Sequence, residues 1–146
     1  MEAFKDQRLE EIVRVIGVGE RRVGGDLALT LLSVEIYRDG FVAQFHLVGG
    51  RPTEGASGMP GFPQFTAAAS DDRGTIYRER PYGGSGGGNS PGRVSWRMAS
   101  AFAPALGEGA RALTLRVGEV AWSTIAEGEM RASHTTAGPW EFVVGL

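Results

Sequence analysis

The sequence contains no cysteine, one lysine (Lys5) and two histidines, and it has no long apolar run. Without cysteine, disulfide bonds, thiolate metal ligands and cysteine nucleophiles are excluded. Without a run of about 18 apolar residues, no membrane-spanning helix is predicted. The segment 1–11 is charged and lacks the apolar core of a signal peptide. We therefore expect a cytoplasmic protein if Met1 is the natural start, while export stays open if the chain is a fragment.

An excess of either charge is also missing, since the net charge is −2 at pH 7. A chain this close to neutral creates no overall field that favours nucleic acid or an anionic membrane as a partner. Of the 15 cationic side chains, only Lys5 is not arginine. Arginine binds anions bidentately, but codon bias in a GC-rich genome explains the same excess, and we favour that second interpretation.

Glycine, in contrast, is abundant, with 23 of 146 residues, and apolar residues alternate between the glycines. The length suits one domain with its own core. The alternation predicts about eight strands, at 12–18, 27–37, 41–48, 64–70, 75–80, 93–102, 111–122 and 140–146. Between them we expect a short helix over 1–11, a Gly/Pro-rich loop over 49–63, a flexible exposed loop over 81–92 and a loosely patterned segment over 123–138.

The clearest local signal is a β-hairpin over 32–47, where two alternating apolar runs meet at Asp39-Gly40. An Asp-Gly pair suits a two-residue type I′ turn, because both residues tolerate positive φ. This turn places Val34 opposite Phe45 on an apolar face, and Tyr37 opposite Val42 on the mixed face.

The strand before this turn changes phase. Leu27, Leu29 and Leu31 share one face, whereas Leu32 and Val34 share the other. A β-bulge near Leu31-Leu32, or a strand that switches between two sheets there, explains the change.

These features predict an all-β protein, with an antiparallel immunoglobulin-like β-sandwich as first choice and a barrel as second. Residues 1–11 are then an N-terminal extension and 12–146 a single domain. The segments 32–42, 70–77, 102–115 and 138–142 (LSVEIYRDGFV, SDDRGTIY, FAPAL…ARALTL and GPWEF) resemble uncharacterised bacterial immunoglobulin-like β-sandwich proteins. The resemblance extends over roughly 12–146 and implies a fold but no activity.

Several motifs are better explained as structural elements than as functional sites. The glycine run 83–89 lacks the lysine of a phosphate-binding loop, and a strand is predicted after it. The run 71–74 (DDRG) offers too few oxygens for calcium, so we interpret it as a tight turn with Gly74 at positive φ. His46 is expected on the mixed face opposite Ser33. His134 has no adjacent acid, so a catalytic triad is not favoured.

Tryptophans and arginines supply the remaining candidates. Trp96, Trp122 and Trp140 alternate with aliphatic residues and are expected in the core. The best candidate binding site is an anion patch at the ends of the glycine-rich loop, formed by Arg73, Arg78, Arg80, Arg93, Arg97, Tyr77 and Tyr82. It requires the strands 75–80 and 93–102 to pair.

The sequence therefore favours a non-enzymatic β-sandwich that acts as a binding or assembly module. A protein partner or a homo-oligomer is expected, and exposed residues such as Tyr37 and Val42 are the suggested contact. No cofactor or metal is predicted. Two alternatives stay open: a module that binds anions or nucleic acid through the arginine patch, and a hydrolase whose residues meet only in the fold.

Overall fold

The computed structural model describes residues 11–50, 62–90, 93–126 and 128–146, which form antiparallel β-strands. The strands are β1 (Ile12–Gly24), β2 (Leu27–Tyr37), β3 (Phe41–Gly50), β4 (Phe62–Gln64), β5 (Ala67–Asp71), β6 (Ile76–Ser90), β7 (Arg93–Ala103), β8 (Ala112–Ala126) and β9 (Glu129–Gly145). In these ranges the chain has no helix of the length and apolarity that crossing a membrane requires. Apart from Glu11, the predicted N-terminal helix lies outside the described residues.

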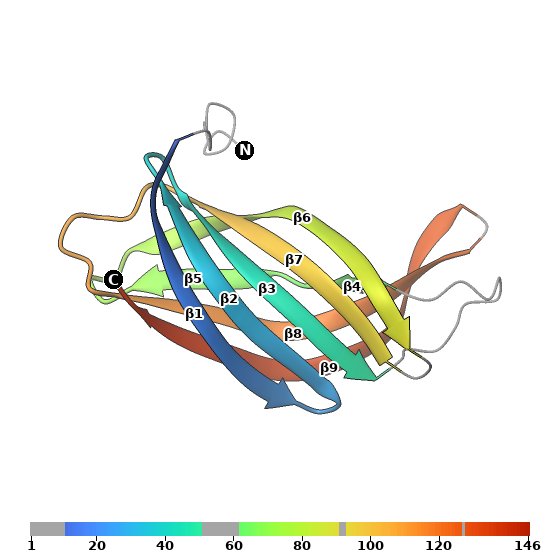
Figure 1. Ribbon diagram of the computed structural model, residues 1–146. Coiled ribbons are helices and arrows are strands. Elements are labelled where there is room, and N and C mark those ends of the chain that lie inside the picture. The colour runs from blue at the N-terminus through green and yellow to red at the C-terminus, as the bar shows by residue number, and fades with distance from the viewer. Residues whose placement is uncertain (1–10, 51–61, 91–92, 127) are drawn as a thin grey trace.

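The strands follow one another in a single curved sheet (Figure 1). Its order is β1-β2-β3-β7-β6-β5-β8, and β9 pairs along the other edge of β8. β5 pairs with residues 113–117 of β8 and β4 with residues 121–123, so β4 and β5 together act as one interrupted strand. The sheet therefore has eight positions, and its two outer strands are β1 and β9.

β1 and β9 lie side by side, which makes the sheet nearly closed and barrel-like (Figure 1). Gly24 of β1 approaches Trp140 of β9 so closely that an added Cβ would lie 2.9 Å from the Trp140 Cε2 atom. The prediction of an all-β antiparallel fold is confirmed. The immunoglobulin-like sandwich stays a prediction. Such a sandwich has two separate sheets, whereas the strands here form one continuous order.

One hydrophobic core fills the inside of the curved sheet. Phe45 is 1% exposed and Val34 and Trp140 are fully buried, as the alternation predicts, while Trp96 packs against the core from its margin. Side chains of this size each stabilise the fold by roughly 1.5–3 kcal/mol when buried. The prediction that the tryptophans belong to the core is therefore confirmed.

The β2–β3 hairpin exists, but its loop is Arg38-Asp39 and not Asp39-Gly40. The Tyr37 amide donates to the Gly40 carbonyl at 2.9 Å, and Val34 lies opposite Ala43. The predicted register was wrong by two residues between the turn and the bulge, and by three residues before the bulge. Between the turn and the bulge the even shift keeps Val34, Ala43 and Phe45 on their predicted face, whereas Leu31 and not Leu32 belongs to the core. In the observed register Phe41 lies opposite Ile36, and its ring stacks on Phe102 at a centroid distance of 4.9 Å.

The strand pairing has a predicted irregularity in β2 and a second irregularity in β8. The pairing of β2 with β3 shifts between Leu31 and Ser33, and the pairing of β8 with β9 shifts between Val117 and Glu119. The first is the β-bulge expected near Leu31-Leu32, which turns the following residues to the other face.

The prediction that Val42 is exposed was wrong, while the partner contact expected at this surface stays a prediction. Val42 is fully buried and packs with Ala101 and Ala103 in a small second cluster, against which Tyr37 is partly buried. These side chains face away from the main core, because they alternate with Phe41 and Phe102. Alternation alone assigned them to the outer face, and it could not show that this face is covered.

Two segments predicted as irregular are strands. Residues 81–90, expected as a flexible loop, continue β6 and pair with β7, and residues 123–138 belong to the long β8–β9 hairpin. In both cases backbone hydrogen bonds to a neighbouring strand form the ladder. The apolar side chains of these segments do not alternate, so the sequence did not predict the strands.

Candidate ligand pocket

The sheet is incomplete between β5 and β6. These strands pair only at Ala69–Tyr77 and Ser70–Ile76, after which β6 continues along β7 and β5 along β8. The backbone ladder between β5 and β6 therefore consists of only these two described pairs. We call this place the β5/β6 seam.

Two positions of the second half of β6 that face the interior are glycines. Gly84 lies opposite Met98 and Gly86 opposite Trp96, so both glycines stand at positions whose partners pack against the core. A residue directly opposite another across an antiparallel pair shares its face. Because glycine has no side chain, these two positions contribute no atoms to the interior beyond the backbone.

A pocket of about 390 Å³ opens in this region. Its described lining residues come from the β4–β5 junction, β7 and β8: Gln64, Phe65, Thr66, Met98, Glu119 and Ala121. Phe65 is 8% exposed and meets the Phe45 ring edge-on at 5.5 Å, so the floor of the pocket is continuous with the core. Gln64, Thr66 and Glu119 are exposed and form its polar rim.

A carboxyl group of β6 lies in the seam and is not among the described residues that line the pocket. Glu79 of β6 lies opposite Phe102, on the inner face of the sheet. Burial raises the pKa of Glu79, while hydrogen bonds from the Ser100 side chain and the Ala67 amide act in the opposite direction. Its buried Oε1 atom has no hydrogen-bond partner among the described residues. Since Ala67 follows the pocket residue Thr66, Glu79 occupies the seam beside the pocket.

The other end of the β5/β6 seam is closed by polar contacts. The buried Asp71 carboxylate accepts hydrogen bonds from the Tyr77 hydroxyl at 2.6 Å and from the Arg73 and Thr75 amides at 2.9 and 3.0 Å. Chiefly because Tyr77 donates to it, the pKa of Asp71 lies below its ordinary value. Gly74 has a φ of 83°, so the tight turn predicted here is confirmed.

Asp72 in the same turn holds a different segment. Its Oδ1 atom accepts from the Arg111 amide at 2.9 Å and from the Ala112 amide at 3.3 Å, where β8 begins. These backbone donors keep the pKa of Asp72 low. Both carboxylates of the turn therefore hold the fold together at this end.

The predicted anion patch depends on pairing between β6 and β7, and that pairing is confirmed. Arg78 lies opposite Ala103, whereas Arg97 lies opposite Ser85, so the two exposed arginines are about 20 Å apart at roughly 3.3 Å per residue. Arg73 lies in the turn before β6. The structure does not bring these three side chains together.

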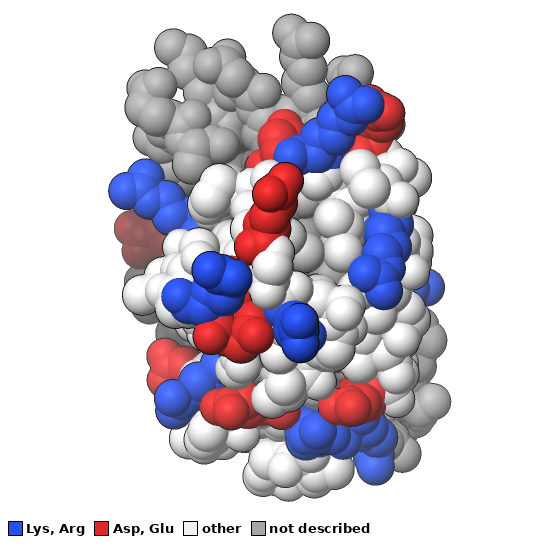
Figure 2. Space-filling view, turned by 90° about the vertical axis from the view of Figure 1, so that its left-hand side faces the viewer, with Lys and Arg blue, Asp and Glu red and all other residues white. Residues whose placement is uncertain are grey.

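The remaining residues of the predicted patch also differ in position. Tyr77 is 4% exposed and points inward to Asp71, so its place in an exposed patch was wrong. Arg80 pairs with Ala101, Arg93 with Ser90, and Tyr82 falls at the irregularity between Pro81 and Gly83; their side chains lie outside what the structure describes. Figure 2 views the end of the molecule that carries the β5–β6 turn, and there cations and anions are interspersed.

The contact between His46 and Ser95 was not predicted from the sequence. His46 lies opposite Thr30 and Arg97, not opposite Ser33, and its Nε2 atom is 2.8 Å from the Ser95 hydroxyl oxygen. The two residues are 49 positions apart in the chain, so no local signal could have paired them. This hydrogen bond joins β3 to β7. His134 lies opposite Trp122, and its side chain is outside the described set.

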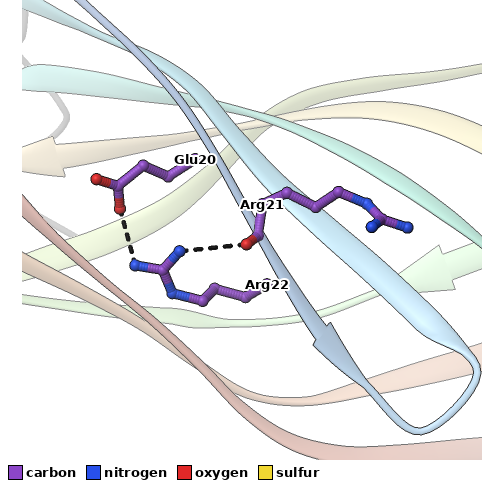
Figure 3. A network of polar contacts seen from close by, with 3 residues as sticks. All are labelled: Glu20, Arg21 and Arg22. Carbon is purple, nitrogen blue, oxygen red and sulfur yellow. Dashed lines mark hydrogen bonds and ion pairs between the residues drawn. The ribbon is translucent and has the colours of Figure 1, made fainter.

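The second seam, between β1 and β9, is filled by side chains. Figure 3 shows the Arg22 guanidinium donating to the Glu20 carboxylate at 2.9 Å and to the Arg21 carbonyl at 3.2 Å. The Arg22 Cζ atom also lies 5.5 Å from the centre of the Phe142 ring. The hydrogen bonds of Arg22 lie within β1, whereas its contact with Phe142 and the fit of Gly24 against Trp140 bridge the two outer strands.

No family model and no curated protein matches the chain. A solved structure, the conserved domain protein from Bacillus anthracis, is similar to it, with a TM-score of 0.62 and 16% identity. The match covers 91% of this chain and 48% of that chain, so this chain spans about half the length of its structural neighbour. At such low identity the likeness shows the fold alone.

Proposed function

We propose that this domain is a non-enzymatic binding module and that the pocket at the β5/β6 seam is its binding site. The observation that carries the proposal is the pocket itself, whose volume of about 390 Å³ falls within the range of small-molecule sites. Phe65 and Met98 supply an apolar floor, and Gln64, Thr66 and Glu119 supply a few polar groups at the rim. A small, mainly apolar ligand suits such a lining.

Two features support a binding role for this opening. The flanking strand is rich in glycine where its side chains would otherwise reach the interior, and the pocket is continuous with a core that is well packed elsewhere. Cores are ordinarily filled to the density of organic crystals. A space of this size at the surface of the core is therefore a feature that a ligand would complete.

The test uses a neutral fluorescent probe, N-phenyl-1-naphthylamine, titrated into the protein. We expect saturable enhancement of its fluorescence, and a loss of affinity of at least about ten-fold in Ala121→Phe, because the larger side chain enters the pocket. Ala68→Phe is the matched control, since Ala68 is exposed on β5 outside the pocket lining. Equal binding by both variants, with circular dichroism showing both folded, would reject the pocket as the site.

The earlier expectations about other partners stay predictions. These are association with a protein or with a second copy of the chain, binding of anions or nucleic acid, and hydrolysis. The resemblance to uncharacterised bacterial immunoglobulin-like proteins also stays a prediction.

A further inference from the structure

We infer that the pocket selects a ligand with a positively charged amino group on an apolar body. This inference rests on the proposed function and adds the chemical class of the ligand. It follows from the charges around the pocket and from the apolar floor.

The described lining of the pocket carries charge of one sign. Glu119 is the only ionisable side chain among the described residues that line the pocket. The two ion pairs within the described residues are Arg22–Glu20 and Arg38–Glu11, and neither involves Glu119. A pocket wall of one sign and low polarity attracts ligands of the opposite sign.

A second carboxyl group reinforces this preference from within the seam. Glu79 is held beside Ala67, the residue after Thr66, and its Oε1 atom is buried without a hydrogen-bond partner among the described residues. Glu79 is not among the described residues that line the pocket, so it acts on a ligand there through its negative potential when it is ionised. An ammonium group at the rim is attracted by both carboxyl groups and can donate to Glu119 through one of its three N–H groups.

The floor of the pocket requires more than an ammonium group. Phe65 and Met98 present an aromatic ring and a thioether, and neither can solvate a small cation fully. An apolar chain or ring attached to the amine would cover this floor. A carboxylate at the same position would face Glu119 without a compensating cation, so fatty acids and other anions are disfavoured.

The experiment is a competition among three eight-carbon molecules for the site of N-phenyl-1-naphthylamine, at pH 7.5 and below micellar concentrations. Octylamine carries a positive charge, octan-1-ol none and octanoate a negative charge. We expect octylamine to displace the probe at a concentration at least about ten-fold lower than octanoate and clearly below octan-1-ol. The advantage of the amine should decrease as salt is added, because Glu119 is exposed.

Variants assign this preference to the two carboxyl groups. In Glu119→Gln we expect the ratio of amine to alcohol affinity to fall by about three-fold or more, and in Glu79→Gln by a smaller factor, with each ratio measured against that variant's own affinity for the probe. Glu141→Gln is the matched control, because Glu141 is exposed on β9 and does not line the pocket. Equal displacement by amine and alcohol, or an unchanged ratio in both variants, would overturn the inference. Failure of the probe to bind at all would instead reject the proposed function.

Discussion

The barrel-like sheet has two seams, and they are closed in different ways. At the β1/β9 seam, Arg22 lies over Phe142 and Gly24 fits against Trp140, so side chains of one strand fill the space beside the other. At the β5/β6 seam, the ladder ends after two pairs and the glycine-rich half of β6 leaves a pocket. The comparison shows that side-chain volume, and not backbone pairing alone, decides whether a gap in a sheet is closed or becomes a site.

The largest effect is expected at the closed seam. Gly24→Val would place its Cβ 2.9 Å from the buried Trp140 ring, and we expect a loss of about 2–3 kcal/mol in the free energy of unfolding from overpacking. Gly17→Val on the same strand is the control: it has no heavy atom within 4 Å of an added Cβ and should change stability by less than about 0.5 kcal/mol. Urea unfolding measures both. Similar values for the two variants would show that β1 does not pack closely on β9.

A smaller effect is expected where the β5/β6 seam is tied. Tyr77→Phe removes the hydroxyl that donates to Asp71, and we expect a loss of about 1–2 kcal/mol at pH 7 because the buried carboxylate keeps one donor fewer. Tyr37→Phe, whose hydroxyl donates to Glu35 at 3.1 Å in a less buried place, should cost about 0.5 kcal/mol.

The pH dependence of this pair has a definite sign. The pKa of Asp71 is below its ordinary 3.8 in the folded protein, so its stabilising contribution is complete above pH 3.8 and disappears as the pH falls through the folded value. The cost of Tyr77→Phe should therefore shrink in strong acid. A cost that stays constant with pH would mean that Asp71 is not the partner that matters.

The smallest effect concerns Glu79 at the open seam. Its pKa is raised above the ordinary 4.5, so its contribution to stability is most favourable below pH 4.5 and declines as the pH rises through the folded value. The free energy of unfolding of Glu79→Gln, minus that of the unchanged protein, should thus be larger at pH 7 than at pH 4. We expect this change with pH to be smaller than the effect of Tyr77→Phe. Urea unfolding at both pH values tests this, with Glu141→Gln as control. The opposite trend would place Glu79 in water or beside a cation.

Much of the fold could be predicted because side chains on a strand alternate. This regularity identified Val34, Phe45 and Trp140 as core residues, and the phase change located the bulge after Leu31. The register error of two residues beside the hairpin turn did not alter the core there, because an even shift preserves the face of a residue. The turn at 71–74 was predictable for a similar reason, since Asp and Gly have local conformational preferences.

The candidate site could not be predicted in the same way. Glycines carry no side chains to alternate, so residues 81–90 resembled a loop although they form half of β6. The pocket residues Thr66, Met98 and Glu119 belong to strands far apart in sequence and share no motif. The arginines attracted attention as a cluster in sequence, but the length of the β6–β7 pair separates Arg78 from Arg97.

The sequence by itself determined that this protein is all-β, which residues face its core, and where the bulge of β2 and the turn at 71–74 fall. These properties depend on neighbouring residues along the chain, whose alternation and backbone preferences are local. Only the tertiary structure decided that β1 lies against β9, that β5 and β6 separate, and that a pocket with an acidic rim opens there. Each of these depends on the volume of side chains from distant strands, which no local pattern encodes.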